Sequence, residues 1–293
     1  MRERLFALLG GVVSLLLVLM ILTPLGQPRP PETSLPTSVD RGDAGLLALG
    51  RWLSGQGVST ASHRAPLTEL PDGRGHLLVM SVPGKAELGA EEARALRAWV
   101  EGGNHLAVFG AFASAPHWRQ LSAGNVETAL QRLELELTNA PPLRPEESGA
   151  DDSSLILTPA RRHPLVAGVD RVHVPGPAAP PPSPNAAFGG HPSLALLEQD
   201  GAPALWWLAR GRGTVIVSAY TGLFSHGALA EADNARFAAN LVNGLLSAKG
   251  RVIFDDYRFG LEQGYDPEAF YGDPRLHVTL LFIAAFWVLY AVG

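Results

Sequence analysis

Two long hydrophobic stretches lie near the ends of the chain. Leu5 to Leu22 is free of charged residues and follows two arginines, and Val278 to Val292 is likewise uncharged and rich in Leu, Phe, Ile and Trp. About 20 apolar residues in a helix cross a hydrocarbon core of roughly 30 Å. The pattern therefore predicts membrane-spanning helices over 5–23 and 277–293. The second is slightly short for a full crossing, and we expect the given chain to be truncated there.

Each stretch has an alternative interpretation. A cleaved signal peptide would need small residues before the cut, whereas Thr23-Pro24-Leu25-Gly26 places proline and leucine there. At the other end the alternative is a buried helix of a soluble domain, but no polar face interrupts the run. The basic residues before Leu5 favour a cytoplasmic N-terminus, with residues 24–276 on the other side of the membrane.

This topology divides the chain into six parts. A spacer rich in proline favours extended geometry and cannot continue a helix. The predicted parts are a cytoplasmic N-terminus (1–4), a spanning helix (5–23), the proline-rich spacer (24–40), an α/β domain (41–256), a juxtamembrane segment (257–276) and a second spanning helix (277–293).

The clearest pattern within the domain is a strand–helix–strand unit. His76 to Met80 and His105 to Phe109 are continuous apolar runs, which are typical of parallel strands covered by helices on both faces. Between them, Ala90 to Glu101 has apolar residues at helical spacing and two glutamates in its first turn. The unit predicts an α/β fold with a mostly parallel, Rossmann-like or flavodoxin-like sheet in three layers.

Weaker patterns complete the domain. Glycine and proline mark the turns between them, and Gly211-Arg212-Gly213 has the spacing of a hairpin. The predicted elements are a helix around 46–53, strands over 58–62 and 154–157, a surface loop over 175–184, hairpin strands over 204–209 and 214–219, a helix over 232–247 and a strand over 251–254.

Composition and missing motifs exclude several functions. The net charge of −5 argues against a nucleic-acid partner, which needs clustered basic residues. The chain has no cysteine, so disulfides, thiolate metal sites and cysteine nucleophiles are excluded. Neither GxxxxGK[ST], HExxH nor GxSxG occurs, and the nine histidines show no recurring metal-ligand spacing. We therefore predict no cofactor and no metal.

Candidate chemistry is expected where the parallel strands end, because ligands of open α/β sheets bind beyond the carboxyl ends of the strands. The adjacent Asp255 and Asp256 could bind a hard cation or orient His226. The simpler interpretation, which we favour, is that one aspartate caps backbone amides and the other is solvated. The candidate rim read from the strand ends comprises Ser81, Phe112, His226, Asp255, Asp256 and Tyr257.

Several segments resemble the bacterial domain-of-unknown-function family DUF4350. They are Gly211 to Val217, Gly222 to Ser225, Asp233 to Ala235, Phe254 to Gly260 and, earlier, Leu96 to Gly103. The resemblance adds Asp233 and Asn234 to the candidate rim. It implies a fold like that of class I glutamine amidotransferases, two membrane helices, and genes near MoxR-type AAA+ ATPases and other membrane proteins.

The resemblance also bears on activity. Amidotransferases need a cysteine on the turn after a central strand, and the corresponding turn here is Gly110-Ala111-Phe112. The family pattern Asp-Glu-Tyr-His-His-Gly reads Asp-Asp-Tyr-Arg-Phe-Gly over 255–260, so both histidines are replaced. This weakens a metal site and suits a structural corner.

We therefore predict a non-catalytic, membrane-anchored scaffold domain that binds protein partners or a small ligand. It would lie on the periplasmic side of a bacterial inner membrane, crossed twice by the chain, within a membrane assembly linked to a MoxR-type ATPase system. The alternative is a hydrolase or metal-dependent enzyme at the C-terminal strand edge that uses Asp255, Asp256 and His226.

Overall fold

The computed structural model describes most of the predicted domain. The predicted spans over 5–23 and 277–293 lie outside the described residues, as do most of the spacer and most of the juxtamembrane segment. The described residues are 33–110, 112–113, 116–122, 125–138, 154–176, 187–261 and 276.

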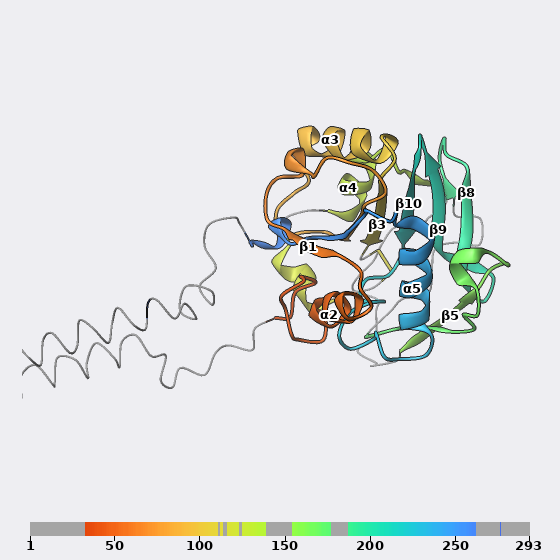
Figure 1. The fold of residues 1–293 in the computed structure, drawn as a ribbon. Coiled ribbons are helices and arrows are strands. Elements are labelled where there is room, and N and C mark those ends of the chain that lie inside the picture. The colour runs from red at the N-terminus through yellow and green to blue at the C-terminus, as the bar shows by residue number, and fades with distance from the viewer. Residues whose placement is uncertain are drawn as a thin grey trace, which may run out of the picture. The chain divides into compact units, whose positions relative to one another are not determined.

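A nine-stranded sheet forms the centre of the fold (Figure 1). Its spatial order is β1-β11-β2-β3-β10-β9-β8-β5-β6. The strands are β1 (Thr60–His63), β2 (Leu77–Val82), β3 (His105–Gly110), β5 (Leu155–Pro159), β6 (Val172–Val174), β8 (Ser193–Gln199), β9 (Ala202–Arg210), β10 (Gly213–Ser218) and β11 (Val252–Asp255), while β4 (Leu137–Thr138) and β7 (Ala187–Phe188) form a separate antiparallel pair.

Four α-helices are found among the described residues. Figure 1 shows α3 and α4 near the top of the view and α2 and α5 near the bottom. The α-helices are α2 (Leu47–Gly55), α3 (Ala90–Glu101), α4 (Val126–Arg132) and α5 (Asn234–Leu245), and the 3-10 turns are η1 (Leu67–Glu69), η2 (His117–Leu121), η4 (Pro164–Val166) and η5 (Tyr257–Phe259).

The predicted strand–helix–strand unit is confirmed as β2–α3–β3. Helix α3 buries Ala93, Leu96 and Val100, which recur at the spacing of one helix face. Every residue of β2 is buried, and Leu77 pairs with His105 in parallel register. The continuous apolar runs thus lie in the middle of the sheet, with side chains packed on both faces.

The predicted fold class is wrong in its sheet. The pairs β1·β11, β11·β2, β2·β3 and β3·β10 are parallel, but β10·β9, β9·β8, β8·β5 and β5·β6 are antiparallel. The two-residue turn after Arg210 can join only antiparallel strands, and the same holds for the turn between β8 and β9. The sheet is therefore mixed, and not the mostly parallel Rossmann-like, amidotransferase-like sheet predicted.

The same prediction included flanking transmembrane helices. Within the part of the chain that the structure describes, no helix combines the length and the apolar character needed to cross a bilayer.

Candidate functional site

The end of β11 occupies the carboxyl edge of the parallel strands. The five strands β1, β11, β2, β3 and β10 run in one direction, so their carboxyl ends share one edge of the sheet. After Asp255, the last residue of β11, the chain turns through Asp256 into η5. Gly260 ends this turn with a φ of 94°, a left-handed conformation that glycine adopts without strain. The corner brings three charged side chains to the edge.

A buried ion pair joins β11 to β2. The Arg258 side chain is 1% exposed, and its Nε donates to Asp255 Oδ2 at 2.6 Å. Its Nη2 donates to the carbonyl oxygen of Ser81 at 3.1 Å. The other oxygen of Asp255, Oδ1, is buried and has no hydrogen-bond partner among the described residues. The pair holds the ends of β11 and β2 together. It leaves Asp255 Oδ1 without a hydrogen bond from a described residue to offset its burial.

Asp256 holds the N-terminal segment of the domain on β1. Its Oδ1 accepts from the backbone N–H of Ser38 at 2.8 Å, and its Oδ2 accepts from the hydroxyls of Ser38 and, at 2.5 Å, of Ser62. Burial raises the pKa of Asp256, while the hydrogen bonds from Ser38 and Ser62 lower it and the nearby charge of Asp255 raises it again. The carboxyl group therefore accepts three hydrogen bonds and connects Ser38 to Ser62 of β1.

An open groove lies between α2 and β1, and we call it the α2–β1 groove. Its cavity volume is about 310 Å³. Four hydroxyl side chains and one cation line it, over a floor that includes the ring of Phe254. The lining residues are Ser38, Leu47, Gly50, Arg51, Ser54, Thr60, Ala61, Ser62 and Phe254. The Ser62 hydroxyl also accepts from Arg64 Nε at 3.0 Å, so it bonds on both sides.

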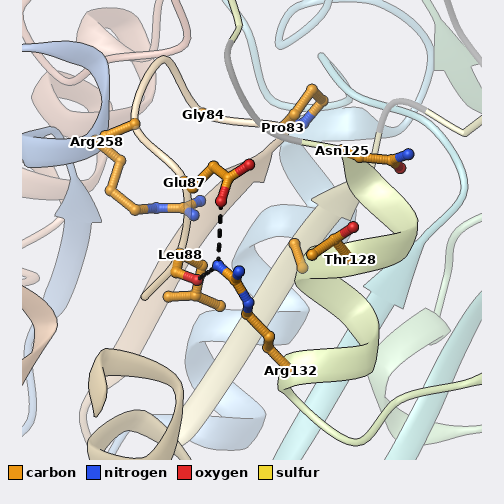
Figure 2. A pocket seen from close by; sticks show the side chains of 10 residues that line it. Pro83, Gly84, Glu87, Leu88, Asn125, Thr128, Arg132 and Arg258 are labelled. Carbon is orange, nitrogen blue, oxygen red and sulfur yellow. Dashed lines mark hydrogen bonds and ion pairs between the residues drawn. The ribbon is translucent and has the colours of Figure 1, made fainter. Parts of the chain in front are cut away.

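A much smaller pocket, with a cavity volume of about 10 Å³, lies beyond the end of β2 (Figure 2). Arg132 Nη1 donates to the carbonyl oxygen of Leu88 and forms an ion pair with Glu87 Oε2 at 3.4 Å. Arg258 lines the same pocket. Because each arginine already has a carboxylate partner, the pocket carries little unbalanced positive charge.

Of three further predicted rim residues, Ser81 and Tyr257 lie at the corner, and Phe112 lies near Trp206 of β9. Ser81 is buried, and its carbonyl oxygen accepts from Arg258. Tyr257 is half-buried at the start of η5. Phe112 is buried, with its ring centroid 6.5 Å from that of Trp206. The prediction of a solvated aspartate is wrong, because Arg258 and the serines allow both carboxyl groups to be buried.

The other rim residues belong elsewhere. His226 is exposed, and its backbone N–H donates to Gly45 O at 2.8 Å. Asp233 and Asn234, at the start of α5, bind the segment around β6. Among the described residues, no hydrogen bond or ion pair joins His226 to either aspartate of the corner.

Sequence reasoning missed three residues of the corner. Arg258 could have been found from its position three residues after Asp255, where the resemblance leads one to expect histidine. Ser38 and Ser62 carried no signal, because their partner Asp256 is 218 and 194 residues away. Within the described ranges, no group of three or more metal-ligating side chains comes together.

Fold and corner define an α/β domain with a mixed sheet, whose carboxyl edge is tied together by buried charges beside an open groove. The chain belongs to the family described as "Domain of unknown function (DUF4350)", whose model matches residues 38–242. The predicted family is thereby confirmed. A search of the curated proteins finds no match.

Similar solved structures are distant. The "mmIFT52 N-terminal domain" is 12% identical, with a TM-score of 0.39 over 57% of this chain and 76% of that one. "Cytoplasmic Protein STM3548 from Salmonella typhimurium" is 12% identical, with a TM-score of 0.40 over 61% and 78%. An exo-beta-1,4-mannosidase from Opitutaceae bacterium strain TAV5 is 13% identical, with a TM-score of 0.35 over 62% and 28%. Similarities this low carry no functional conclusion.

Proposed function

We propose that the chain is a non-catalytic, membrane-anchored scaffold domain that binds partner proteins, within a membrane assembly linked to a MoxR-type ATPase system. The observation that carries the proposal is that the charged side chains of the corner already have partners within the domain. Asp255 is paired with Arg258, and Asp256 receives three hydrogen bonds from Ser38 and Ser62. Carboxyl groups committed to holding loops and strands are not placed for acid–base work on a substrate.

The α2–β1 groove supports the binding role. It is open, it offers hydroxyl groups, and Arg51 on its wall is exposed. Polar side chains above an apolar floor are the composition expected where a partner gains both burial and orientation.

We further propose that residues 24–276 lie on the periplasmic side of a bacterial inner membrane. The uncharged stretches at 5–22 and 278–292 and the arginines before the first support this location. An alkaline phosphatase fused after residue 270 should be active. A fusion that is inactive there, while a cytoplasmic reporter at the same position works, would contradict the proposed side.

The binding role is tested by site-specific photo-crosslinking in native membranes. A photoreactive amino acid replaces Ser54 in the groove or, as a matched control, the exposed Glu91 on α3. We expect one defined protein to be crosslinked from position 54 and not from 91, with a yield that falls when the gene for the MoxR-type ATPase is deleted. Equal labelling from both positions would contradict a groove-dependent partner.

A hydrolase acting at the same edge is the second candidate. The Ser62 hydroxyl lines the groove and donates to the buried carboxyl of Asp256, which is the pairing of a nucleophile with a base. This candidate predicts cleavage of ester, amide or phosphate test substrates that Ser62→Ala abolishes while Ser54→Ala leaves it intact. Our proposal predicts no such cleavage, and Ser62-dependent turnover would replace it.

A further inference from the structure

The two edges of the nine-stranded sheet are treated differently. At the first edge, β1 pairs with β11 alone. Ser59 O accepts from Val252 N–H, and His63 O accepts from Asp256 N–H. In a parallel ladder the residues of a strand alternate in direction, so Thr60 and Ser62 turn their backbone N–H and C=O groups away from β11. No hydrogen bond among the described residues uses those outward groups.

At the opposite edge, the outer side of β6 is closed by a side chain. The amide of Asn234 accepts from the N–H of His173 at 2.7 Å and donates to the carbonyl oxygen of the same residue at 2.7 Å. Asp233 Oδ2 accepts from the backbone N–H groups of Asp170 at 2.9 Å and Arg171 at 3.1 Å. A side-chain amide thus takes the place of a further strand, which is one way to prevent edge-to-edge pairing. By contrast, no hydrogen bond from a described side chain closes the β1 edge.

The α2–β1 groove runs beside this open edge. Thr60, Ala61 and Ser62 of β1 form one wall, and α2 contributes Arg51 and Ser54. Arg51 is the one charged residue among those that line the groove, in a chain whose net charge is −5. The groove therefore presents a positive group and hydroxyl donors next to unused backbone donors and acceptors.

We propose that β1 binds an extended, acidic segment of a partner protein as a tenth strand. The inference rests on the proposed binding function and names its docking surface. Main-chain hydrogen bonds to Thr60 and Ser62 would hold the segment, and Arg51 would bind one of its carboxylates. Four residues of strand span about 13 Å, so a segment of four to five residues is sufficient.

A second copy of the chain is a poorer occupant. Edge-to-edge pairing of two β1 strands would bring two Arg51 side chains into one interface, and like charges disfavour it. The sequence of β1, Thr-Ala-Ser-His, supplies no carboxylate to pair with them. Charge complementarity thus favours an acidic partner.

The test selects peptides on the full chain in detergent. A random heptapeptide phage library is the probe, and the best peptide is then made synthetically with a fluorescent label. We expect selected peptides to be acidic. N-methylation of alternate residues on one edge of the peptide should weaken binding at least tenfold, because it removes backbone donors, and methylation of the other set should not.

Two matched pairs of variants complete the test. Thr60→Pro removes an outward N–H at the first position of an edge strand, where proline is tolerated, and Thr60→Val keeps it. We expect at least tenfold weaker binding for the first and less than a twofold change for the second. Arg51→Glu should weaken binding tenfold, whereas Arg94→Glu, at an exposed position of α3, should leave it unchanged.

The outcomes separate the inference from the function it rests on. Selected peptides that are basic, or that bind equally to Thr60→Pro and tolerate N-methylation at both edges, overturn strand addition while a groove partner found by crosslinking still stands. Failure to select any peptide also overturns it. A dimer that Thr60→Pro dissolves would assign the edge to a second copy and overturn the acidic partner. Should Thr60→Pro unfold, the N-methylated peptides decide alone.

Discussion

Removing Arg258 should destabilise the domain more than most single substitutions. The variant Arg258→Met keeps an unbranched apolar side chain and removes the guanidinium group with its charge. It leaves the carboxyl group of Asp255, whose side chain is fully buried, without the 2.6 Å partner that neutralises it. The carbonyl oxygen of Ser81 loses a donor at the same time.

The magnitude follows from that burial. Breaking a buried ion pair by deleting one partner costs about 3–5 kcal/mol, because the remaining charge stays desolvated. For a folded unit of about this size, 1 kcal/mol shifts the Tm by about 2–4 °C. We therefore expect the Tm of Arg258→Met to fall by about 6–20 °C.

The assay is urea and thermal unfolding of the full chain in detergent, followed by tryptophan fluorescence. The control is the double variant Asp255→Leu/Arg258→Met, which replaces the pair with apolar groups and should recover most of the lost stability. A single variant that loses less than about 1 kcal/mol, or a double variant less stable than the single, would refute the description of this pair as buried and mutually dependent.

Three further predictions concern titration and the closed sheet edge. Burial raises the pKa of Asp256 above its ordinary value of 3.8, so the folded state binds more protons than the unfolded state between the two values. Its contribution to the free energy of unfolding should fall as pH rises through that window, and Asp256→Asn should remove the dependence. Burial lowers the pKa of His105 from 6.5. Between the lowered pKa and 6.5, the unfolded state therefore binds more protons than the folded state. Stability should be lost as pH falls below 6.5, less so in His105→Gln, as measured by Tm from pH 8 to 5. Asn234→Ala removes three hydrogen bonds, to both backbone groups of His173 and to Leu223 O, and should cost about 2–4 kcal/mol in urea unfolding and deprotect the β6 amides in hydrogen exchange.

Each of these has a defined contrary result. An Asp256→Asn profile parallel to that of the wild type would mean that the carboxyl does not titrate differently in the folded state. A His105→Gln variant as acid-sensitive as the wild type would place the sensitivity elsewhere. Protection of β6 unchanged in Asn234→Ala would show that its edge is closed by something other than this amide.

The sequence predicted the middle of the sheet well and its outer half poorly. Strands β2 and β3 are continuous apolar runs on either side of an amphipathic helix, a pattern that few alternatives share. The hairpin around Gly211 was equally visible, and the structure confirms it. The prediction of a mostly parallel sheet overlooked what this hairpin implies. A tight hairpin makes β9 antiparallel to β10, and the next three pairings in the sheet are antiparallel as well. Strand order beyond β10 depends on tertiary contacts that no local pattern records.

The corner was located correctly but interpreted only in part. Asp255 and Asp256 stand at a strand end, as predicted, yet alternation along a strand suggested that one of them faces water. The strand ends at Asp255, so alternation no longer applies to its neighbour. The anchor in Ser38 lay in a segment predicted to be a spacer, and only folding brings it to a carboxyl 218 residues later in the chain.

The position of β11 between β1 and β2 constrains how the chain is made. During synthesis Val252 follows its β1 partner Thr60 by 192 residues and its β2 partner Leu77 by 175, so the parallel half of the sheet stays incomplete until β11 has been made. Until then, β1 and β2 each have an unpaired edge where β11 will bind. These edges must not pair with each other or with other chains. Products that terminate before residue 252 should accumulate as aggregates rather than as a smaller folded core.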